Sequence, residues 1–359
     1  MKKFASMRLE VTSKCNLNCK YCHNLEFNNC NNDMTIGEIK RLIINAKQIW
    51  GVNKILITGG EPLLLNGEIF KLISFISKLG IKADLVTNGT LLTAKVISNL
   101  EHAGLKRIRI SIDNVEKVQS FRGDKIEQLR LWETAKLVKQ VSNINLCIHT
   151  VCSSLNVESL YEIYKKVLEI NADRWRVFDL GYQGALLKYS NSFNMEFFYK
   201  NILNEVSKIL DDYLSLEDTD ILDIEINNIF KSSLLRLKYN KENSNFFDKL
   251  LSEKLCKSPC DYVTDHQITV RSDGKATLCQ YFHNTIYDLK KYDFNIEMAL
   301  KNEILCRENE ITVKDLEYCT KCKYFLVCNS GCRAKAGVLT ENIVDADPTA
   351  CVLYPKLIN

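Results

Sequence analysis

The chain has 359 residues, of which 46% are apolar and 26% charged, a balance that is ordinary for a protein with a buried core. This length favours two domains. The net charge of +4 is mild and like charges form no block, which argues against nucleic acid or an anionic membrane as a partner. Arg8 and Glu10 interrupt the N-terminus before a signal-peptide core can form, and no run approaches the roughly 20 apolar residues of a spanning helix. We therefore expect a cytoplasmic protein, in which fifteen cysteines indicate metal binding rather than disulfides.

Residues 8–12 alternate between polar and apolar side chains and predict a strand that leads into a loop with three cysteines, Cys15, Cys19 and Cys22. A 4Fe-4S cluster normally takes four cysteine thiolates. A loop that offers three therefore leaves one iron open to a ligand that is not protein. The alternative is a zinc site, because Cys19 and Cys22 alone have the spacing of half a zinc ribbon.

Short apolar strands alternate with amphipathic helices beyond this loop. Thr35 and Glu38 form a capping-box pattern that opens a helix, and Gly51 ends that helix. The further predicted strands are 54–58, 82–87, 107–112, 145–151 and 174–180, and the further predicted helices are 66–79, 92–103, 126–141 and 157–169. Six strands that alternate with helices predict an α/β fold with a parallel sheet, which right-handed crossovers would curve into a partial (β/α)6 barrel.

Polar residues follow several of these strands, at the sheet edge where ligands of such folds bind. They are Gly59, Gly60, Glu61 and Pro62 after the second strand, Thr87 and Asn88 after the third, Ser111 and Asp113 after the fourth, and His149 with Thr150 after the fifth. Two glycines let the backbone approach a ligand closely, and Glu61 could accept a hydrogen bond from an ammonium group. A simple turn is the alternative for residues 59–62. We also expect His23 and His149 near this edge, with structural hydrogen bonds as their role.

The spacing Cys15-x3-Cys19-x2-Cys22, with Tyr21 inside it, resembles the signature of the radical S-adenosylmethionine (SAM) superfamily. The resemblance implies that the open iron is chelated by the methionine moiety of SAM. One electron, from an external flavodoxin or ferredoxin type of donor, then cleaves SAM to methionine and a 5'-deoxyadenosyl radical. The cofactor contacts that the resemblance implies are Tyr21 in the loop, Gly59, Gly60, Glu61 and Pro62 at the amino group, Ser111 and Asp113 at the ribose, Thr87 and Asn88 at the side of the cofactor, and Arg122 at the carboxylate.

Residues 181–255 contain helical patterns at 195–214 and 226–238 and carry no cysteine. We interpret this segment as a helical bridge. The expected division is therefore a barrel core at 1–180, the bridge at 181–255 and a cysteine-rich domain at 256–359.

Nine cysteines lie in the last of these segments. They are Cys256, Cys260, Cys279, Cys306, Cys319, Cys322, Cys328, Cys332 and Cys351. Residues 268–271 and 275–279 around Gly274 predict a β-hairpin, 296–306 a helix, and 319–332 a tight turn that leads into a short helix. The spacing resembles the seven-cysteine SPASM extension of a branch of radical SAM enzymes, which implies an α+β domain with two auxiliary 4Fe-4S clusters.

The SPASM resemblance also implies a ligand set for each auxiliary cluster. Cys260, Cys279 and Cys332 hold one cluster, and Cys319, Cys322, Cys328 and Cys351 hold the other. We predict Cys256 as the fourth ligand of the first cluster, with Cys306 as its rival. Zinc bound by the same thiolates is the alternative, since four sulfurs suit either metal. We expect the remaining cysteines to be buried or free thiols, namely Cys30, Cys147, Cys152 and Cys306.

The branch implies an oxidoreductase that modifies a peptide or protein substrate, by cross-linking, epimerisation or a similar reaction. Gln280 stands where sulfatase-maturing enzymes carry an aspartate base, which argues against formylglycine formation. Because the site begins at residue 15, we expect no leader-binding domain before it, and this leaves a tetrapyrrole, an aminoglycoside or a nucleotide as an alternative substrate. The loop also resembles the GTP cyclase branch, whose C-terminal glycine-arginine tail is missing here. A non-catalytic electron-transfer or zinc scaffold protein is the third alternative, and it does not account for residues 59–62.

Overall fold

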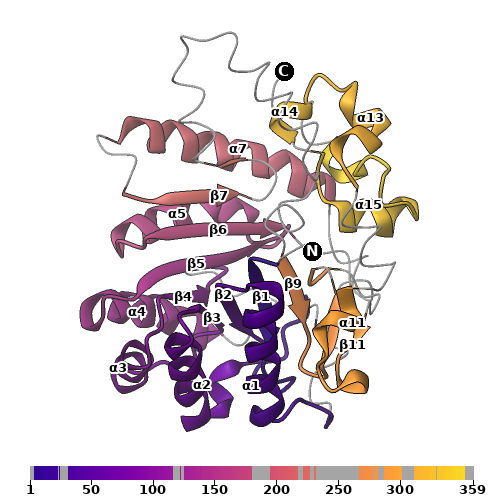
Figure 1. Ribbon diagram of the computed structural model, residues 1–359. Helices are drawn as coiled ribbons and strands as arrows, with labels where there is room; N and C mark the ends of the chain where they lie inside the picture. Colours follow the sequence, from indigo (N-terminus) through magenta and orange to yellow (C-terminus); the bar gives the residue numbers. More distant parts are fainter. Residues whose placement is uncertain are drawn as a thin grey trace.

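An eleven-stranded sheet organises the computed structural model of the chain (Figure 1), in the order β11-β10-β9-β1-β2-β3-β4-β5-β6-β7-β8. The structure describes residues 4–22, 24, 31–115, 122, 125–179, 195–216, 221–226, 230–231, 267–277, 279–281, 287–300, 311–328 and 330–351. Within these residues, no helix has both the length and the hydropathy needed to cross a membrane.

The middle of the sheet is parallel and follows the order of the chain. Its strands are β1 (Ser6–Glu10), β2 (Lys54–Thr58), β3 (Lys82–Thr87), β4 (Arg107–Ser111), β5 (Asn145–Cys152), β6 (Arg174–Asp179) and β7 (Asp223–Ile226). Parallel neighbours need crossover connections. The helices that provide them are α1 (Ile36–Asn45), α2 (Gly67–Lys78), α3 (Ala94–His102), α4 (Lys125–Val141), α5 (Leu160–Glu169) and α7 (Met195–Ser215). The predicted α/β class with a partial barrel is confirmed.

Most predicted boundaries agree with the structure to within a few residues, and β1 shows why one of them shifts. This strand ends at Glu10 rather than at residue 12, and Val11 N–H donates to Thr58 O, 2.9 Å away, as the chain leaves the strand. Short helical turns extend several elements: a π-helical turn η2 (Ala46–Trp50), and 3-10 turns η3 (Pro62–Leu65), η4 (Val157–Ser159), η6 (Lys290–Tyr292) and η7 (Val313–Asp315).

Side chains alternate between the two faces of the sheet because the strand period is two residues. On β1 and β4, Met7, Leu9, Ile108 and Ile110 are fully buried in the same hydrophobic core as the helices. The residues between them point to the opposite face, which we call the inner face. This face is polar: it carries Arg8, Glu10, Lys54, Thr58, Lys82, Asp84, Arg107, Arg109, Ser111, Cys147, His149, Arg174, Arg176, Asp223 and Glu225.

The helix predicted at 226–238 is wrong in the part that the structure describes. Ile226 ends strand β7, and Phe230–Lys231 form the antiparallel strand β8. The physical reason is a period of two: Ile224 and Ile226 are buried, and Asp223 and Glu225 between them pair with arginines of β6. The segment interpreted as a bridge thus adds a seventh parallel strand to the barrel. The boundaries at 180 and 255 lie outside the described residues and stay a prediction.

The cysteine-rich half joins the same sheet. Strands β9 (Gln267–Val270) and β10 (Lys275–Thr277) form the predicted antiparallel hairpin, with Gly274 at φ 84° in its turn. Strand β9 also pairs in parallel with β1, so this half lies directly beside the strand that carries the cysteine loop. The remaining elements are β11 (Tyr287–Asp288), α11 (Ile296–Leu300), α13 (Glu317–Thr320), α14 (Phe325–Cys328) and α15 (Arg333–Thr340), and the last three helices lie together beyond the sheet in Figure 1.

Candidate active site

The three cysteines of the N-terminal loop lie at the C-terminal edge of the sheet, directly after β1. Cys22 N–H donates to Cys19 O over 3.0 Å, which closes a tight turn between these two residues. The backbone N–H of Leu17 points at Cys15 Sγ over 3.4 Å. All three thiols are half-buried, and burial raises their pKa values, that of Cys22 to about 11. The loop therefore offers three soft sulfur donors, and one of them, Cys15 Sγ, already accepts a backbone hydrogen bond. This donor set fits an iron-sulfur cluster with one iron left open.

Residues 59–61 hold this loop through the backbone. Gly60 N–H donates to Thr12 O and Glu61 N–H donates to Lys14 O, each over 2.7 Å. A Cβ atom at Gly59 would lie 2.4 Å from Thr12 O, and one at Gly60 would lie 2.1 Å from Lys14 O. The space that both glycines leave is therefore filled by the cysteine loop, and not only by a ligand as the sequence suggested.

Glu61 is fully buried and connects two loops of the site. Its carboxylate accepts hydrogen bonds from Leu63 N–H at 3.0 Å, from the Thr87 hydroxyl at 2.8 Å and from Asn88 N–H at 2.7 Å. Burial raises the pKa of this carboxyl, and these donors oppose the shift. Pro62 follows Glu61, begins the 3-10 turn η3 and is also buried. Glu61 thus fixes the end of β3 relative to the loop after β2.

Asn88 contacts the cysteine loop directly. Its Nδ2 donates to Asn16 Oδ1 over 2.8 Å, and Asn16 Nδ2 donates to the Thr90 hydroxyl, also over 2.8 Å. Asn16 is the residue after Cys15, so this pair positions the first thiol. Asn16 and Thr90 were not predicted as site residues. They lie in two loops far apart in the sequence, and no spacing or motif connects them.

Asp113 connects the loop to the ends of β4 and β5. Its Oδ1 accepts from Val151 N–H at 2.8 Å, and its Oδ2 accepts both from Arg122 Nε at 2.9 Å and from the Tyr21 hydroxyl. The Arg122 guanidinium also lies 5.4 Å from the centre of the Tyr21 ring. The structure thus brings together three residues that the sequence assigned to three different cofactor contacts. Ser111 lies two residues before Asp113 and is buried.

Asp33 is a further anchor that the sequence did not reveal. Its Oδ2 accepts from the Thr12 hydroxyl at 2.9 Å and from Ser13 N–H at 2.8 Å. A single aspartate in a polar stretch has no signal that distinguishes it from a solvated residue. Asp33 fixes the chain two residues before Cys15.

A cavity of about 130 Å³ that is partly open to solvent lies in the C-terminal half, and its lining includes Cys319, Cys322, Cys328 and Cys351. These are the four ligands predicted for one auxiliary cluster. Cys322 N–H donates to Cys319 O over 3.0 Å, which repeats the turn between Cys19 and Cys22. Burial raises the pKa of Cys328 to about 12. Four thiols around one cavity form a donor set of the right chemistry and number for a 4Fe-4S cluster.

The other predicted ligands are only partly described. Cys332 does not line this cavity, and its N–H donates to Asp347 Oδ2 over 2.8 Å. Cys279 is buried at the end of the hairpin, and Cys147 and Cys152 are buried thiols as expected. Several predicted residues lie outside the described part of the chain: His23, Cys30, Cys256, Cys260 and Cys306.

The choice between zinc and iron-sulfur clusters stays a prediction. Within the described residues, no three His, Cys, Asp or Glu side chains are grouped as they would be around a bound metal ion.

Comparison with known proteins places the chain. The Radical SAM superfamily pattern matches residues 9–174, which include the cysteine loop and the rim residues from Gly59 to Arg122. This match covers just under half of the chain and shows its similarity to the radical SAM superfamily. The named relatives described below are enzymes, which supports an enzyme over the alternative of a non-catalytic scaffold.

Relatives of the chain have different named activities. PqqA peptide cyclase of Bradyrhizobium diazoefficiens is 30% identical over 186 residues, which is 50% of this chain and 47% of the relative. The chain thus spans about half the length of that relative. GTP 3',8-cyclase of Clostridium botulinum is 28% identical over 301 residues, 81% of this chain and 85% of the relative. AdoMet-dependent heme synthase of Methanosarcina barkeri is 25% identical over 362 residues, 96% and 95% of the two chains.

Two solved structures resemble nearly the whole chain in fold. The structure of anSMEcpe with bound AdoMet has a TM-score of 0.73 at 20% identity and covers 98% of this chain and 91% of its own. Streptococcus suis SuiB bound to its precursor peptide SuiA has a TM-score of 0.71 at 17% identity, and covers 98% and 76%. At such identities the likeness shows the fold, and it extends through the cysteine-rich half.

Proposed function

We propose that this radical SAM enzyme cleaves SAM reductively and uses the resulting radical to modify a peptide or protein substrate oxidatively. The observation that carries the proposal is the anchoring of one three-cysteine loop to the ends of β2, β3 and β4 through Gly60, Asn88 and Asp113. When bound, the cluster and SAM supply a 5'-deoxyadenosyl radical that abstracts hydrogen. The chain itself supplies orientation and shielding.

The proposed cofactor contacts keep the residues named from the sequence, with roles adjusted to their partners. Cys15, Cys19 and Cys22 hold the cluster. Asp113 fixes the guanidinium of Arg122 at the rim by its 2.9 Å ion pair, and we keep Arg122 as the proposed contact to the methionine carboxylate. Tyr21, which donates to the same carboxylate, keeps the cluster loop in register with this cation.

The rim contacts predicted from the sequence remain part of the proposal. They comprise Gly59, Gly60, Glu61 and Pro62 near the methionine amino group, Thr87 and Asn88 beside the cofactor, and Ser111 near the ribose.

We also propose two auxiliary 4Fe-4S clusters. The cavity lined by Cys319, Cys322, Cys328 and Cys351 supports one of them. The other would be held by Cys260, Cys279 and Cys332, with Cys256 as the fourth ligand. A cluster that is ligated by four thiolates cannot bind a substrate sulfur, so it would accept or relay the electron that substrate oxidation releases. An external flavodoxin or ferredoxin type of donor would supply the electron for SAM cleavage.

Iron analysis tests the clusters. Anaerobically reconstituted enzyme should contain about twelve irons per chain, four for each of three clusters. Cys351→Ala should lose about four of these irons, because it removes a proposed cluster ligand. Cys147→Ala is the control: it removes a cysteine that is fully buried on strand β5 and is no proposed ligand, so it should lose none. Zinc in place of iron would overturn the assignment. Cys19→Ala should abolish release of 5'-deoxyadenosine, because two thiolates cannot hold the first cluster.

The peptide substrate is supported by the names of relatives: one cyclises the peptide PqqA, and SuiB was solved with its precursor peptide. A small-molecule substrate is the second candidate, because the relatives that match most of this chain are named for GTP and heme. Incubation with short peptides encoded beside the gene, with GTP and with a porphyrin distinguishes the two. Stimulated 5'-deoxyadenosine release and a mass loss of two hydrogens from a peptide would support the proposal. Turnover of GTP or porphyrin alone would select the second candidate.

A further inference from the structure

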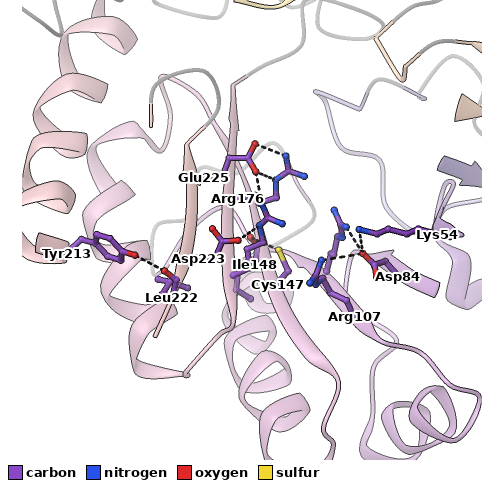
Figure 2. A network of polar contacts seen from close by, with 12 residues as sticks. Lys54, Asp84, Arg107, Cys147, Ile148, Arg176, Tyr213, Leu222, Asp223 and Glu225 are labelled. Carbon is purple, nitrogen blue, oxygen red and sulfur yellow. Dashed lines mark hydrogen bonds and ion pairs between the residues drawn. The ribbon is translucent and has the colours of Figure 1, made fainter. Parts of the chain in front are cut away.

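The inner face of the sheet carries more positive than negative charge. On β1 to β7 its seven cations are Arg8, Lys54, Lys82, Arg107, Arg109, Arg174 and Arg176, and its four carboxylates are Glu10, Asp84, Asp223 and Glu225. Figure 2 shows two paired groups on this face, with Lys54 and Arg107 around Asp84 on one side of Cys147 and Arg176 at Glu225 on the other. These pairs satisfy the carboxylates at the inner end of the barrel.

Arg8 stands apart from both groups. It is 9% exposed, and Nη2 donates to the Thr58 hydroxyl over 3.2 Å, while Nε–H has no hydrogen-bond partner. Among the described residues, no carboxylate lies within ion-pair distance of Arg8, although Glu10 attracts it from further away. A buried donor without a partner costs about 1–3 kcal/mol, and more when it is charged. The guanidinium of Arg109 on β4 pairs with Asp84 through Nη2 at 2.6 Å, whereas its Nε is buried without a hydrogen-bond partner.

His149 lies among these cations. Its Nε2 is buried and has no hydrogen-bond partner, so the structural hydrogen bond expected for this residue is absent at that atom. Burial lowers the pKa of His149 well below its usual value, and the charges of Arg109, Arg176 and Arg8 lower it further. The ring is packed edge-on against Phe178, with ring centres 5.0 Å apart. The donors that lack partners thus surround a region of positive potential.

This region lies next to the cofactor rim. Ser111, His149 and Arg176 are in register on β4, β5 and β6. Val151, two residues after His149 on the same face, donates to Asp113. A group bound at His149 would therefore lie level with Ser111 and two residues below the contact between Val151 and Asp113. This places it next to the residues proposed to hold SAM, so that a substrate bound there could present a C–H bond to the cofactor.

We propose that Arg8, Arg109 and His149 form a binding site for a carboxylate of the substrate, so that the peptide carries an aspartate or glutamate close to the modified residue. The carboxylate would accept hydrogen bonds from the unpartnered Nε–H groups and neutralise part of the excess charge. The choice of a carboxylate rests on the peptide substrate proposed above. The same donors could bind a phosphate group, which would indicate a nucleotide substrate instead of a peptide.

Anaerobic titration calorimetry on cluster-loaded, SAM-bound enzyme tests this site. N-acetylglutamate α-amide is the probe, N-acetylglutamine α-amide the uncharged control, and inorganic phosphate the alternative anion. The glutamate probe should bind saturably and the glutamine probe should not. Arg8→Gln and His149→Gln should each weaken binding about tenfold or more, as loss of a charged hydrogen bond does. Arg8→Lys keeps the charge and should retain much of the affinity.

Arg107→Gln is the matched control. It removes the same charge from the same face, but its guanidinium pairs with Asp84 at 3.6 Å, and binding should stay within about threefold of wild type. Equal affinity in Arg8→Gln and wild type, or no binding of the glutamate probe at all, would overturn the proposal. Binding of phosphate alone would overturn the acidic peptide and indicate a nucleotide. SAM cleavage by the wild-type enzyme in the same samples distinguishes a failure of this binding site from a failure of the proposed function. If cleavage is absent, the proposed function itself fails.

Discussion

Gly60 and Lys14 are in direct backbone contact, because a Cβ atom on Gly60 would lie 2.1 Å from Lys14 O and 2.5 Å from Lys14 C. This contact places the loop after β2 against the residue before Cys15. We expect Gly60→Ala to push the cysteine loop out of position, so that the enzyme loses most of its SAM cleavage and part of its first cluster. The measurements are iron content and the rate of 5'-deoxyadenosine release.

Gly67→Ala is the matched control for Gly60→Ala. A Cβ at Gly67 meets nothing within 4 Å, and this residue begins helix α2. Alanine there should be neutral or should stabilise the protein by about 0.4–1 kcal/mol. If Gly60→Ala behaves like Gly67→Ala, the contact does not position the loop.

The Asp33 carboxylate should matter more than its isolated place in the sequence suggests. Asp33→Ala removes two acceptor contacts, to Thr12 and Ser13, and should lower the free energy of unfolding by about 1–3 kcal/mol and slow cluster loading. Asp293→Ala breaks an ion pair with Arg41 between two exposed side chains and should cost less than about 1 kcal/mol. Chemical denaturation and the time course of iron incorporation measure both variants. Equal effects of the two substitutions would contradict the role given to Asp33.

The Tyr21 hydroxyl donates to the carboxylate that also holds Arg122. Tyr21→Phe removes this donor and should destabilise the protein by about 1–2 kcal/mol. The Asp113 carboxylate, which holds Arg122, then has one hydrogen bond fewer. We therefore expect the KM for SAM to rise while iron content stays at the wild-type value. Tyr292→Phe changes an exposed tyrosine and should alter neither quantity. An unchanged KM in Tyr21→Phe would remove Tyr21 from the proposed cofactor site.

His149 should make stability depend on pH in the acid range. Burial, together with Arg109 and Arg176, Arg8 and Arg174 from the neighbouring strands, lowers the pKa of its imidazole. Below pH 6.5 the unfolded chain therefore binds a proton that the folded chain does not, and the free energy of unfolding falls by up to about 1.4 kcal/mol for each pH unit. Denaturation at pH 5 to 8 should show this fall in wild type.

His149→Gln should flatten that part of the profile, because glutamine does not titrate. A profile of His149→Gln that has the same slope as wild type would show that the imidazole binds its proton at the same pH in the folded and the unfolded chain, which would contradict the lowered pKa.

The alternation of strands and helices was predictable because it is a local pattern. Buried positions recur every second residue in strands such as β4 and on one face of helices such as α2. The same pattern was misread at 226–238, where Ile224 and Ile226 belong to a strand whose partner, β6, lies about 50 residues earlier. Pairing over that distance leaves no trace in a short window.

The sequence by itself determined the chemistry of the site, because Cys15, Cys19 and Cys22 must share one loop whatever the fold, and the turn between Cys19 and Cys22 closes through a local hydrogen bond. Tertiary structure alone decided what holds that loop. Tyr21 meets Asp113 across 92 residues, and β9 lies beside β1 although more than 250 residues separate them. Tertiary structure also left Arg8 and His149 without partners at Nε and Nε2. Contacts of this kind depend on the crossovers and register of the whole sheet, and spacing along the chain does not encode them.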